Sequence, residues 1–444
     1  MAIISLCVIT KNQEKLLEAC LNFGRTIADE MIVVDLQSTD STKALAKKFT
    51  DKVFDFKWKD NFADARNFAI KKAKGDWILM LDANEKISPK FVGQIRKLIE
   101  DPDYDAFSFN QKTFTHHTER FGFVQQAHLT YPGYVEAPVV KLFRNKKNIK
   151  YQYALFETVL PSLLEQGNRI KNSNIPLFHY ETDTERPATK GAYVRTILKK
   201  QLGNMPQDPK AHYDYATELL AQKSFPSALS HFKQAELLNK KQLISKARLN
   251  YALGTTSFLL QKYQDAITYL KQGLKANPND LLSYVMLGRV LIFAKQYADV
   301  LGVIATAKEH AIVHPELLNM AGFSFLQLRE HKQGLQTLLY AKKVAEEQAD
   351  YAQLELITNN IITALIEIGN ATKAIDLLED AIKKTPHVGS YYFNLIQLFE
   401  RQQTPEGLKA ALKYTKKAKK QLASALPAHV AAELDEKQKE LNKA

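Results

Sequence analysis

Residues 77–85 have the sequence Trp77-Ile78-Leu79-Met80-Leu81-Asp82-Ala83-Asn84-Glu85, an apolar run that ends abruptly in acidic and amide side chains. A continuous apolar run of this length is typical of a strand buried on both faces of a parallel sheet. Open α/β sheets bind their ligands at the carboxyl ends of such strands. We therefore expect a strand over Trp77–Leu81 that carries Asp82 to a ligand site.

Three more apolar runs precede this stretch, and helical patterns separate them. The expected strands are Ile3–Ile9, Met31–Val34 and Val53–Phe56. The expected helices run from Asn12, as the cap, to Gly24, from Thr39 or Asp40 to Phe49, and over Ala63–Ala73. Strands and helices that alternate at this spacing favour right-handed crossovers and a mostly parallel sheet. Thr10 and Asp35 then lie at the same edge as Asp82.

A nucleotide-binding sheet of this kind must offset the charge of a diphosphate. Glycine-rich loops do so through backbone amides in dinucleotide-binding and P-loop proteins, but residues 1–90 contain only Gly24 and Gly75. The remaining means are basic side chains, or a divalent ion such as Mg²⁺ or Mn²⁺ held by carboxylates. Asp82, Asn84 and Glu85 offer oxygen ligands for such an ion. The alternative is an ordinary polar turn after a strand.

From about Ala211 the sequence changes to paired helical patterns without strands. A spacing of 34 residues separates Gly254, Gly288 and Gly322, and also Tyr263 and Tyr297. This pattern resembles the tetratricopeptide repeat, in which the small residue lets two helices approach and the aromatic residue fills the gap between hairpins. We expect five or six units across 211–421. A terminal helix over Leu426–Lys443 would shield the last apolar edge.

The composition is that of a globular protein, with 45% apolar and 25% charged residues among 444. No stretch approaches the roughly 18–20 apolar residues of a membrane-spanning helix, and no basic segment precedes the apolar start, so we expect a cytoplasmic protein. Cys7 and Cys20 lie on expected core faces, which argues against a disulfide framework. The net charge of +13 is compatible with anionic ligands or membrane surfaces. The sequence has no signature of nucleic-acid binding.

A set of short motifs is spread over the first 200 residues. The motifs are Cys7-Val8-Ile9-Thr10-Lys11-Asn12, Val33–Thr42, Ala65-Arg66-Asn67, Gly75-Asp76-Trp77, the Asp82–Glu85 turn and Lys141-Leu142-Phe143-Arg144-Asn145. Together they resemble the family 2 glycosyltransferases of the GT-A fold. The resemblance implies an α/β GT-A domain with a mostly parallel sheet over residues 1–205. An all-α tetratricopeptide-repeat solenoid with a capping helix is expected over 206–444.

The resemblance also implies a site for a UDP-sugar donor. Thr10 and Asp35 would hold the base, with Asp35 accepting from the uracil imide. A carboxylate acceptor opposite an N–H is also what recognition of the base requires on chemical grounds. Ser38 would belong to the same site. Arg66 would face the phosphates. The alternative interpretation is that Arg66 is an arginine on a helix surface.

A divalent cation, Mg²⁺ or Mn²⁺, is the cofactor that the resemblance implies. Asp82 would contact the ribose or the metal. Asn84 stands where the family usually has the metal-binding aspartate of its Asp-x-Asp motif, and an amide in that place removes one negative charge. His179, in Leu177-Phe178-His179-Tyr180, matches a family histidine that can be a further metal ligand. A structural histidine at a strand end is the alternative.

Glu157 aligns with the glutamate of a His-Glu pair in the family, and Phe156 replaces the histidine. We expect Glu157 to be the catalytic base, because inverting transfer needs a carboxylate that takes the proton of the acceptor while the diphosphate leaves from the other face. A thiol acceptor reduces this need, since some thiolate is already present near neutral pH. The alternative is a salt-bridged glutamate.

Residues 111–136 are rich in aromatic and histidine side chains. These are Phe114, His116, His117, Phe121, Phe123, His128, Tyr131 and Tyr134. A zinc cluster, a loop that stacks on the acceptor, and ordinary packing against the sheet are the three interpretations of this segment.

The leading hypothesis is a metal-dependent inverting glycosyltransferase that moves a hexose from a UDP-sugar to a Cys or Ser/Thr side chain of a small peptide, as in the maturation of glycocin bacteriocins. The repeats would grip the peptide or pair two protomers into a dimer. One alternative is a transferase of cell-envelope polysaccharide, although no membrane tether is visible in the sequence. The other is a repeat scaffold with an inactive transferase domain, which Asn84 keeps open.

Overall fold

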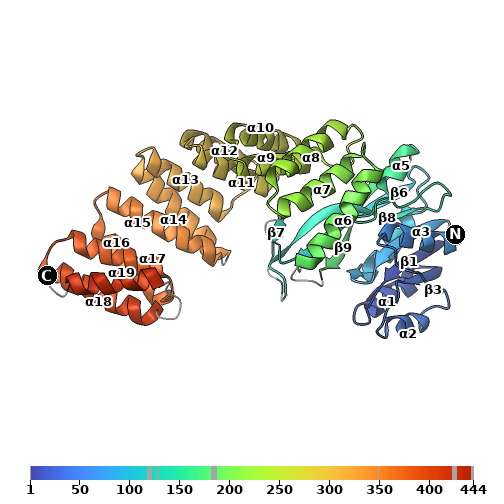
Figure 1. Ribbon diagram of the computed structural model, residues 1–444, viewed down its shortest axis with the longest axis horizontal. Coiled ribbons are helices and arrows are strands. Elements are labelled where there is room, and N and C mark those ends of the chain that lie inside the picture. The colour runs from blue at the N-terminus through green and yellow to red at the C-terminus, as the bar shows by residue number, and fades with distance from the viewer. Residues whose placement is uncertain are drawn as a thin grey trace. The chain divides into compact units, whose positions relative to one another are not determined.

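The computed structural model describes residues 2–117, 123–126, 128, 130–181, 188–348, 350–422 and 428–441. The chain divides into two compact units, Met1–Asn277 and Pro278–Ala444. The first unit holds a β-sheet and the helices that follow it, and the second unit is helical throughout its described residues (Figure 1).

The sheet begins with four strands that pair in parallel, as the apolar runs predicted. They are β1 (Ile4–Thr10), β2 (Glu30–Asp35), β3 (Val53–Asp55) and β4 (Trp77–Asp82), in the spatial order β3-β2-β1-β4. The order reverses at β1, so this is the switch point at which such sheets bind ligands.

Later strands extend the sheet with mixed pairing. They are β5 (Glu85–Lys86), β6 (Ala106–Thr115), β7 (Phe123–Gln125), β8 (Gly133–Arg144) and β9 (Ile170–Tyr180). The order continues β4-β8-β6-β9-β5, with β8 antiparallel to β4 and to β6, and β9 parallel to β6. The sheet as a whole is therefore mixed, with its parallel part at the amino-terminal end of the chain.

Helices cover both faces of the sheet, and an apolar core lies under each cover. One face packs against α1 (Leu17–Ile27), α2 (Thr42–Lys47) and α4 (Val92–Leu98, which follows the 3₁₀ turn Pro89–Phe91), and the other against α3 (Phe62–Lys72) and α5 (Leu160–Glu165). Alternate residues of β1 serve the two cores: Leu6 and Val8 face one, and Cys7 and Ile9 the other.

Two predictions about the first helix are wrong in detail. Asn12 does not cap α1, because it has a φ of 51° and its Oδ1 accepts from the backbone N–H of Thr39 at 2.8 Å. Gly24 does not end the helix, which continues to Ile27. It allows a close approach instead, since a Cβ there would lie 2.4 Å from Cδ2 of Leu6.

Among the described residues of the first unit, the elements that follow β9 are all helices. They are α6 (Ala188–Asn204) and the pairs α7 (Pro209–Ala221) with α8 (Phe225–Leu238), and α9 (Lys246–Leu259) with α10 (Tyr263–Ala276). Gly254 brings the two helices of its pair together, because a Cβ at this position would lie 2.6 Å from Cγ of Leu270. The small residue thus has the role that its spacing predicted.

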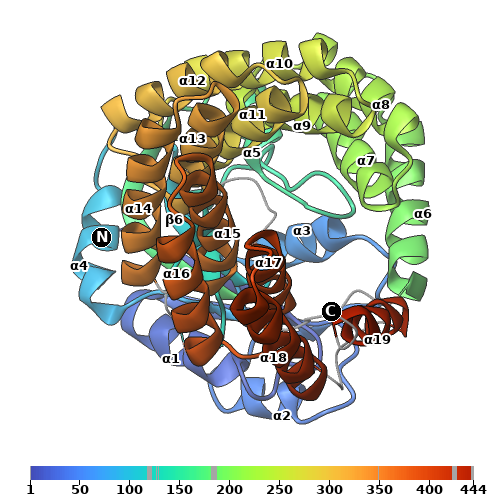
Figure 2. The ribbon, with the colours of Figure 1, turned by 90° about the vertical axis from the view of Figure 1, so that its left-hand side faces the viewer.

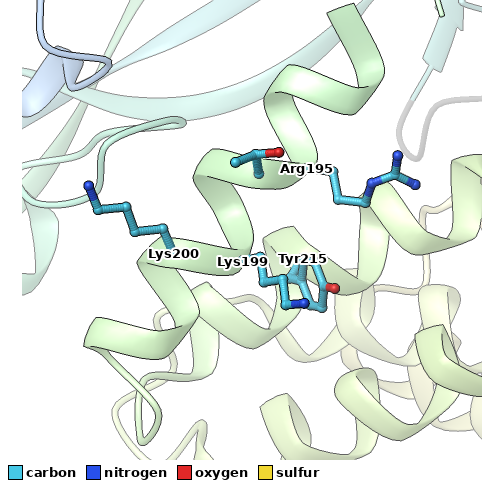
Figure 3. A pocket seen from close by; sticks show the side chains of 5 residues that line it. Arg195, Lys199, Lys200 and Tyr215 are labelled. Carbon is cyan, nitrogen blue, oxygen red and sulfur yellow. The ribbon is translucent and has the colours of Figure 1, made fainter. Parts of the chain in front are cut away.

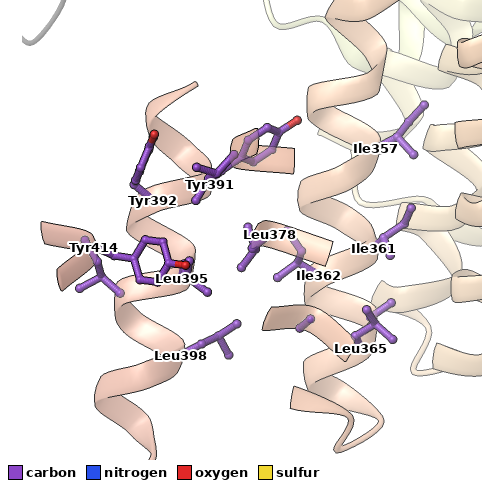
Figure 4. Packing of buried hydrophobic residues seen from close by; sticks show 14 of the residues in the cluster. Ile357, Ile361, Ile362, Leu365, Leu378, Tyr391, Tyr392, Leu395, Leu398 and Tyr414 are labelled. Atoms are coloured by element: carbon purple, nitrogen blue, oxygen red, sulfur yellow. The ribbon is translucent and has the colours of Figure 1, made fainter. Parts of the chain in front are cut away.

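The second unit continues with helix pairs (Figure 2). They are α11 (Leu281–Phe293) with α12 (Tyr297–Glu309), α13 (Pro315–Gln327) with α14 (His331–Glu347), α15 (Tyr351–Glu367) with α16 (Ala371–Lys384), and α17 (Gly389–Arg401) with α18 (Pro405–Leu422), followed by α19 (Ala428–Leu441). Leu378 of α16 lies between the apolar side chains of α15 and α17 (Figure 4). Leu434 of α19 is buried in the same core.

The turn inside each of the six pairs contains a residue with positive φ. These residues are Lys223, Gln261, Lys295, Arg329, Gly369 and Gln403. The repeated backbone conformation supports the prediction of five or six equivalent units. Within the described residues, no helix has the length and apolar character to cross a membrane.

Candidate active site

The carboxyl ends of β1, β2 and β4 bring three of the predicted site residues together. Thr10 is the register partner of Asp35 across β1 and β2, and Asp82 is the partner of Ile9 across β1 and β4. Because each strand ends at this edge, the side chains of Thr10, Asp35 and Asp82 occur at the same level of the sheet. Sequence spacing alone predicted this gathering.

Thr10 and Asp35 keep polar atoms without a partner. Both residues are buried, and neither Oγ1 of Thr10 nor Oδ1 of Asp35 has a hydrogen-bond partner among the described residues. The other carboxylate oxygen of Asp35 accepts from the backbone N–H of Ser38 at 3.0 Å. Buried polar atoms in native proteins are almost always paired, so an orphaned carboxylate oxygen at a ligand-binding edge indicates a missing donor.

Ser38 lies in the loop after β2, but its hydroxyl has a structural partner. Its Oγ accepts from the backbone N–H of Asn12 at 2.9 Å, while Oδ1 of Asn12 accepts from Thr39 N–H. The loops after β1 and β2 are thus joined by reciprocal hydrogen bonds. Ser38 thus helps to fix the loop beside Asp35.

Arg66 of α3 holds two of the predicted acidic residues. Its Nη2 lies 2.8 Å from Oδ1 of Asp82 and 2.6 Å from Oε1 of Glu157, and its Nε donates to the same Glu157 oxygen at 2.7 Å. The guanidinium is buried and lies over the ring of Tyr151 at 5.3 Å. Arg66 is therefore no surface residue. Its Nη1 has no protein partner.

Lys141 is a second cation at the centre of the site, and its role was missed from the sequence. It is buried on β8, with its Nζ 2.7 Å from Oε1 of Glu85 and 3.8 Å from Oδ2 of Asp82. Glu85 also accepts from the backbone N–H of Asp82 at 3.0 Å. The available signal was a lysine inside an otherwise apolar strand, Val139–Phe143.

These charges set the protonation of Asp82. Burial alone would raise its pKa, but the positive charges of Arg66 and Lys141, together with His179, outweigh burial and hold the pKa below its usual range. Asp82 is therefore ionised at neutral pH. Burial acts against the charge of Arg66 too, yet Asp82 and Glu157 raise its pKa well above the ordinary value.

Asn84 and His179 meet where β5 pairs with β9. Glu85 is the register partner of His179, which brings the preceding Asn84 amide within 3.0 Å of Nε2 of His179. The same amide nitrogen donates to the carbonyl of Tyr180 at 3.0 Å. Nδ1 of His179 is buried and has no partner within the described ranges of the chain. The two residues that the resemblance singled out for a metal are thus neighbours, although 95 positions separate them.

Three side chains at this corner carry donor atoms of the types that divalent ions take. Asp82 offers a carboxylate that is about one quarter exposed, Asn84 an amide, and His179 an imidazole. Within the described residues, no three His, Cys, Asp or Glu side chains gather as a metal site. An ion held here would therefore depend on the Asn84 amide and on oxygen atoms of a bound diphosphate.

The described part of the aromatic segment packs on itself and on β9. Phe114 is buried and stacks on Tyr180 with a centroid distance of 5.2 Å, while His128 and Tyr134 lie 4.8 Å and 5.6 Å from it. Phe121 lies outside the described residues. These contacts favour the packing interpretation for Phe114 and its neighbours.

A separate groove lies between α6 and α7. It has a volume of about 560 Å³ and is lined by Arg195, Thr196, Lys199, Lys200 and Tyr215 (Figure 3). None of the predicted site residues lines it. The strand-end site is therefore identified by the unpaired polar atoms and the ion pairs of its residues, and not by this groove.

Comparison with known proteins agrees with this geometry. Residues 5–159 match the model of the family "Glycosyl transferase family 2". That range begins in β1 and ends just after Glu157, so it contains every predicted site residue except His179.

Three curated relatives extend the comparison. A TPR repeat-containing protein of Synechococcus elongatus is 32% identical over 216 residues, which are 47% of this chain and 50% of that protein. An uncharacterised glycosyltransferase of Rickettsia bellii is 29% identical, over 49% of this chain and 73% of its own. The prophage-derived glycosyltransferase SunS of Bacillus subtilis is 24% identical over 270 residues, 59% of this chain and 60% of its own.

The chain thus spans about half the length of the first of these relatives. Helix pairs with a glycine at 34-residue intervals follow the matched domain, as the tetratricopeptide pattern requires. The chain therefore carries a family 2 glycosyltransferase domain of the GT-A type, followed by helical repeats of the tetratricopeptide type.

Proposed function

We propose that this protein is an inverting glycosyltransferase that moves a hexose from a UDP-sugar to a Cys or Ser/Thr side chain of a small peptide, with Mg²⁺ or Mn²⁺ as cofactor. The proposal goes beyond the family in its donor, its acceptor and its metal. Association into a dimer through the repeats and a cytoplasmic location stay predictions.

One observation carries the proposal: buried polar atoms without partners lie beside ion-paired acidic residues at a single sheet edge. Oδ1 of Asp35 and Oγ1 of Thr10 are free to receive and hold a base. A uracil ring presents an imide N–H that suits a carboxylate acceptor. Asp82 lies on the next strand, between β1 and β8, where a ribose or a diphosphate would follow the base.

The proposed chemistry assigns one task to each charged residue. Asp35 binds and orients the base, and the free Nη1 of Arg66 is available to a phosphate oxygen. Glu157, whose carboxylate lies 2.6 Å from Nη2 of Arg66, takes the proton of the acceptor hydroxyl. A divalent ion held by Asp82, Asn84 and His179 would supply positive charge that stabilises the departing diphosphate.

A peptide acceptor is supported by the architecture of the whole chain. Tetratricopeptide-type helices follow the transferase domain, and stacked helical repeats commonly bind extended peptides. The alignment with SunS covers 270 residues and is thus longer than the domain match of 5–159, so it includes residues outside that domain. Polysaccharide synthesis and an inactive scaffold are the alternatives.

The test is incubation of the full-length protein with a panel of UDP-hexoses and Mg²⁺ or Mn²⁺, with and without small peptides encoded beside its gene. Release of UDP would establish an active donor site, and a hexose-sized mass gain on a peptide would identify the acceptor. Release of UDP without any modified peptide would favour the polysaccharide alternative. No release with any donor or metal would favour the scaffold.

A further inference from the structure

The loop that carries Glu157 is closed by a pair of backbone hydrogen bonds, and two of its residues have a strained backbone conformation. Gln152 and Thr158 exchange backbone hydrogen bonds of 3.0 and 3.1 Å, so residues 153–157 form a separate protrusion. Tyr153 has a φ of 76° and Phe156 a φ of 56°. Bulky residues rarely adopt this left-handed conformation, which persists only where the surroundings fix it.

Helix α6, the first described helix after the sheet, holds this loop through one side chain. Gln201 of α6 is 5% exposed, and its Oε1 accepts from the backbone N–H of Ala154 at 2.8 Å and from that of Leu155 at 3.4 Å. Its own Nε2 has no partner in the part of the chain that the structure describes. The hydrogen bonds that the Gln201 side chain makes there therefore go to the loop alone.

Residues at the start of α7 hold the same loop through a second set of contacts. The hydroxyl of Tyr153 donates to Oδ2 of Asp208 at 2.8 Å, while Oδ1 of Asp208 caps α7 through Ala211 N–H at 2.7 Å. Lys210 lies over the rings of both Tyr153 and Phe156, at 4.9 and 5.7 Å. The two strained residues are therefore held from α7, and the backbone between them from α6.

The loop reaches the centre of the site at its other end. Ala154 accepts from the backbone N–H of Phe62 at the start of α3, the helix that carries Arg66. Glu157 follows the strained Phe156 and contacts Arg66. A change in the backbone at Ala154 or Leu155 would move the carboxylate of Glu157 away from the guanidinium.

We propose that Gln201 is a positioning residue for the transfer reaction, which acts by holding the 153–157 loop so that Glu157 stays in its catalytic place. This inference rests on the proposed role of Glu157 as the base. It makes the helices that follow the sheet part of the active centre, although the domain match ends at residue 159.

The test is Gln201→Met in the full-length protein, which keeps the size of the side chain but removes the acceptor. Misplacement of a reacting group by about 1 Å can lower a rate roughly a hundredfold. We expect kcat for transfer to a serine peptide to fall about ten- to a hundredfold, with KM for the UDP-sugar unchanged. Gln201→Glu, which keeps an acceptor oxygen, should recover much of the rate.

The matched control is Gln94→Met, because Gln94 also makes a hydrogen bond from its side chain to a distant backbone group, the carbonyl of Ser173 at 3.3 Å. It should leave kcat unchanged. Hydrogen–deuterium exchange gives a readout that is independent of chemistry. Exchange of the Ala154 and Leu155 amides should accelerate in Gln201→Met and not in Gln94→Met.

The double variant Glu157→Gln/Gln201→Met separates this inference from the proposed function. If Gln201 acts through Glu157, the second substitution adds little to the loss caused by the first. An equal further loss, unchanged exchange, or full activity of Gln201→Met beside an inactive Glu157→Gln would overturn the positioning role alone. Full activity of Glu157→Gln would overturn the proposed base, and the inference with it.

Discussion

Two halves of the same sheet edge are built in opposite ways. At the ends of β1 and β2, Thr10 and Asp35 each bury an oxygen atom that has no hydrogen-bond partner among the described residues. In the other half, Asp82, Glu85 and Glu157 are all paired with Arg66 or Lys141. The first half has the character of a receptor that a ligand completes. In the second, each carboxylate already has a cationic partner in the protein.

The largest effect should come from Asp82→Ala in the paired half. Removal of the carboxylate leaves Arg66 and Lys141 without their shared partner and removes the proposed metal ligand. UDP release should fall at least a hundredfold, the scale of losing one preorganised electrostatic group. Asp55→Ala is the control, because Asp55 also ends a parallel strand but pairs with the exposed Lys43. Comparable losses in both variants would contradict a specific role for Asp82.

Glu157→Gln should distinguish two acceptors. A hydroxyl needs a base, whereas a thiol supplies some thiolate by itself. Transfer to a serine peptide should fall roughly a hundredfold, and transfer to the cysteine version of the same peptide much less. Rates for the two peptides with one donor provide the measurement. Equal and negligible losses would remove Glu157 from the mechanism.

Arg66→Met should expose the energetic difference between the two halves. Breaking a buried pair from one side costs about 3–5 kcal/mol, and here two carboxylates lose their partner. The pKa of Asp82 is lowered to about 2 in the folded protein, so its contribution is complete above its unfolded value of about 3.9 and is lost progressively as the pH falls from there through about 2.

The measurement is the free energy of unfolding in urea at pH 7 and at pH 3.5. The loss caused by Arg66→Met should be large at pH 7 and smaller at pH 3.5. Arg25→Met, which removes a hydrogen bond at the protein surface, should cost less than about 1 kcal/mol at both values. A loss that does not depend on pH would show that packing of Arg66, rather than its charge, matters.

Asp35→Asn should act on binding rather than on stability. The amide can still accept from Ser38 N–H, but it offers no charge to an imide donor. Affinity for UDP should weaken about tenfold, as for one hydrogen bond to a charged group, with little change in the free energy of unfolding. Calorimetric titration with UDP and with CDP, which lacks the imide, is the measurement. Equal weakening for both nucleotides would contradict the contact.

The smallest effect is expected for Thr10→Val. Its hydroxyl has no partner in the free protein, so removing it should leave stability unchanged or slightly increased. Affinity for UDP should weaken only a few-fold, measured by the same titration. A clear loss of stability would indicate that the hydroxyl is satisfied in the free protein and that the two halves are built alike.

The sequence predicted the parallel strands well, because an uninterrupted apolar run such as Trp77–Leu81 fits few other structures. It predicted that Thr10, Asp35 and Asp82 gather, since parallel strands end at one edge. The pattern already offered Asn84 as an oxygen ligand, whereas His179 was pointed to by the resemblance. Their contact depends on the short pairing of β5 with β9, which periodicity does not reveal.

Other features were beyond the reach of local patterns. Arg66 and Glu157 are 91 positions apart, and Lys141 and Glu85 are 56 apart, so their pairing depends on the finished topology. Asn12 had the residue type of a helix cap, but it forms a hydrogen bond across to the neighbouring loop instead. In each case a tertiary contact decided the outcome over local preference.

The turns of the helix pairs have a consequence for engineering. Five of the six place Lys, Gln or Arg in the left-handed conformation, and only the turn at Gly369 uses the residue that adopts it without steric cost. The same backbone strain therefore recurs at five of these six turns. Glycine at the five turns offers a route to a more heat-resistant protein that leaves the helices and the strand-end site untouched.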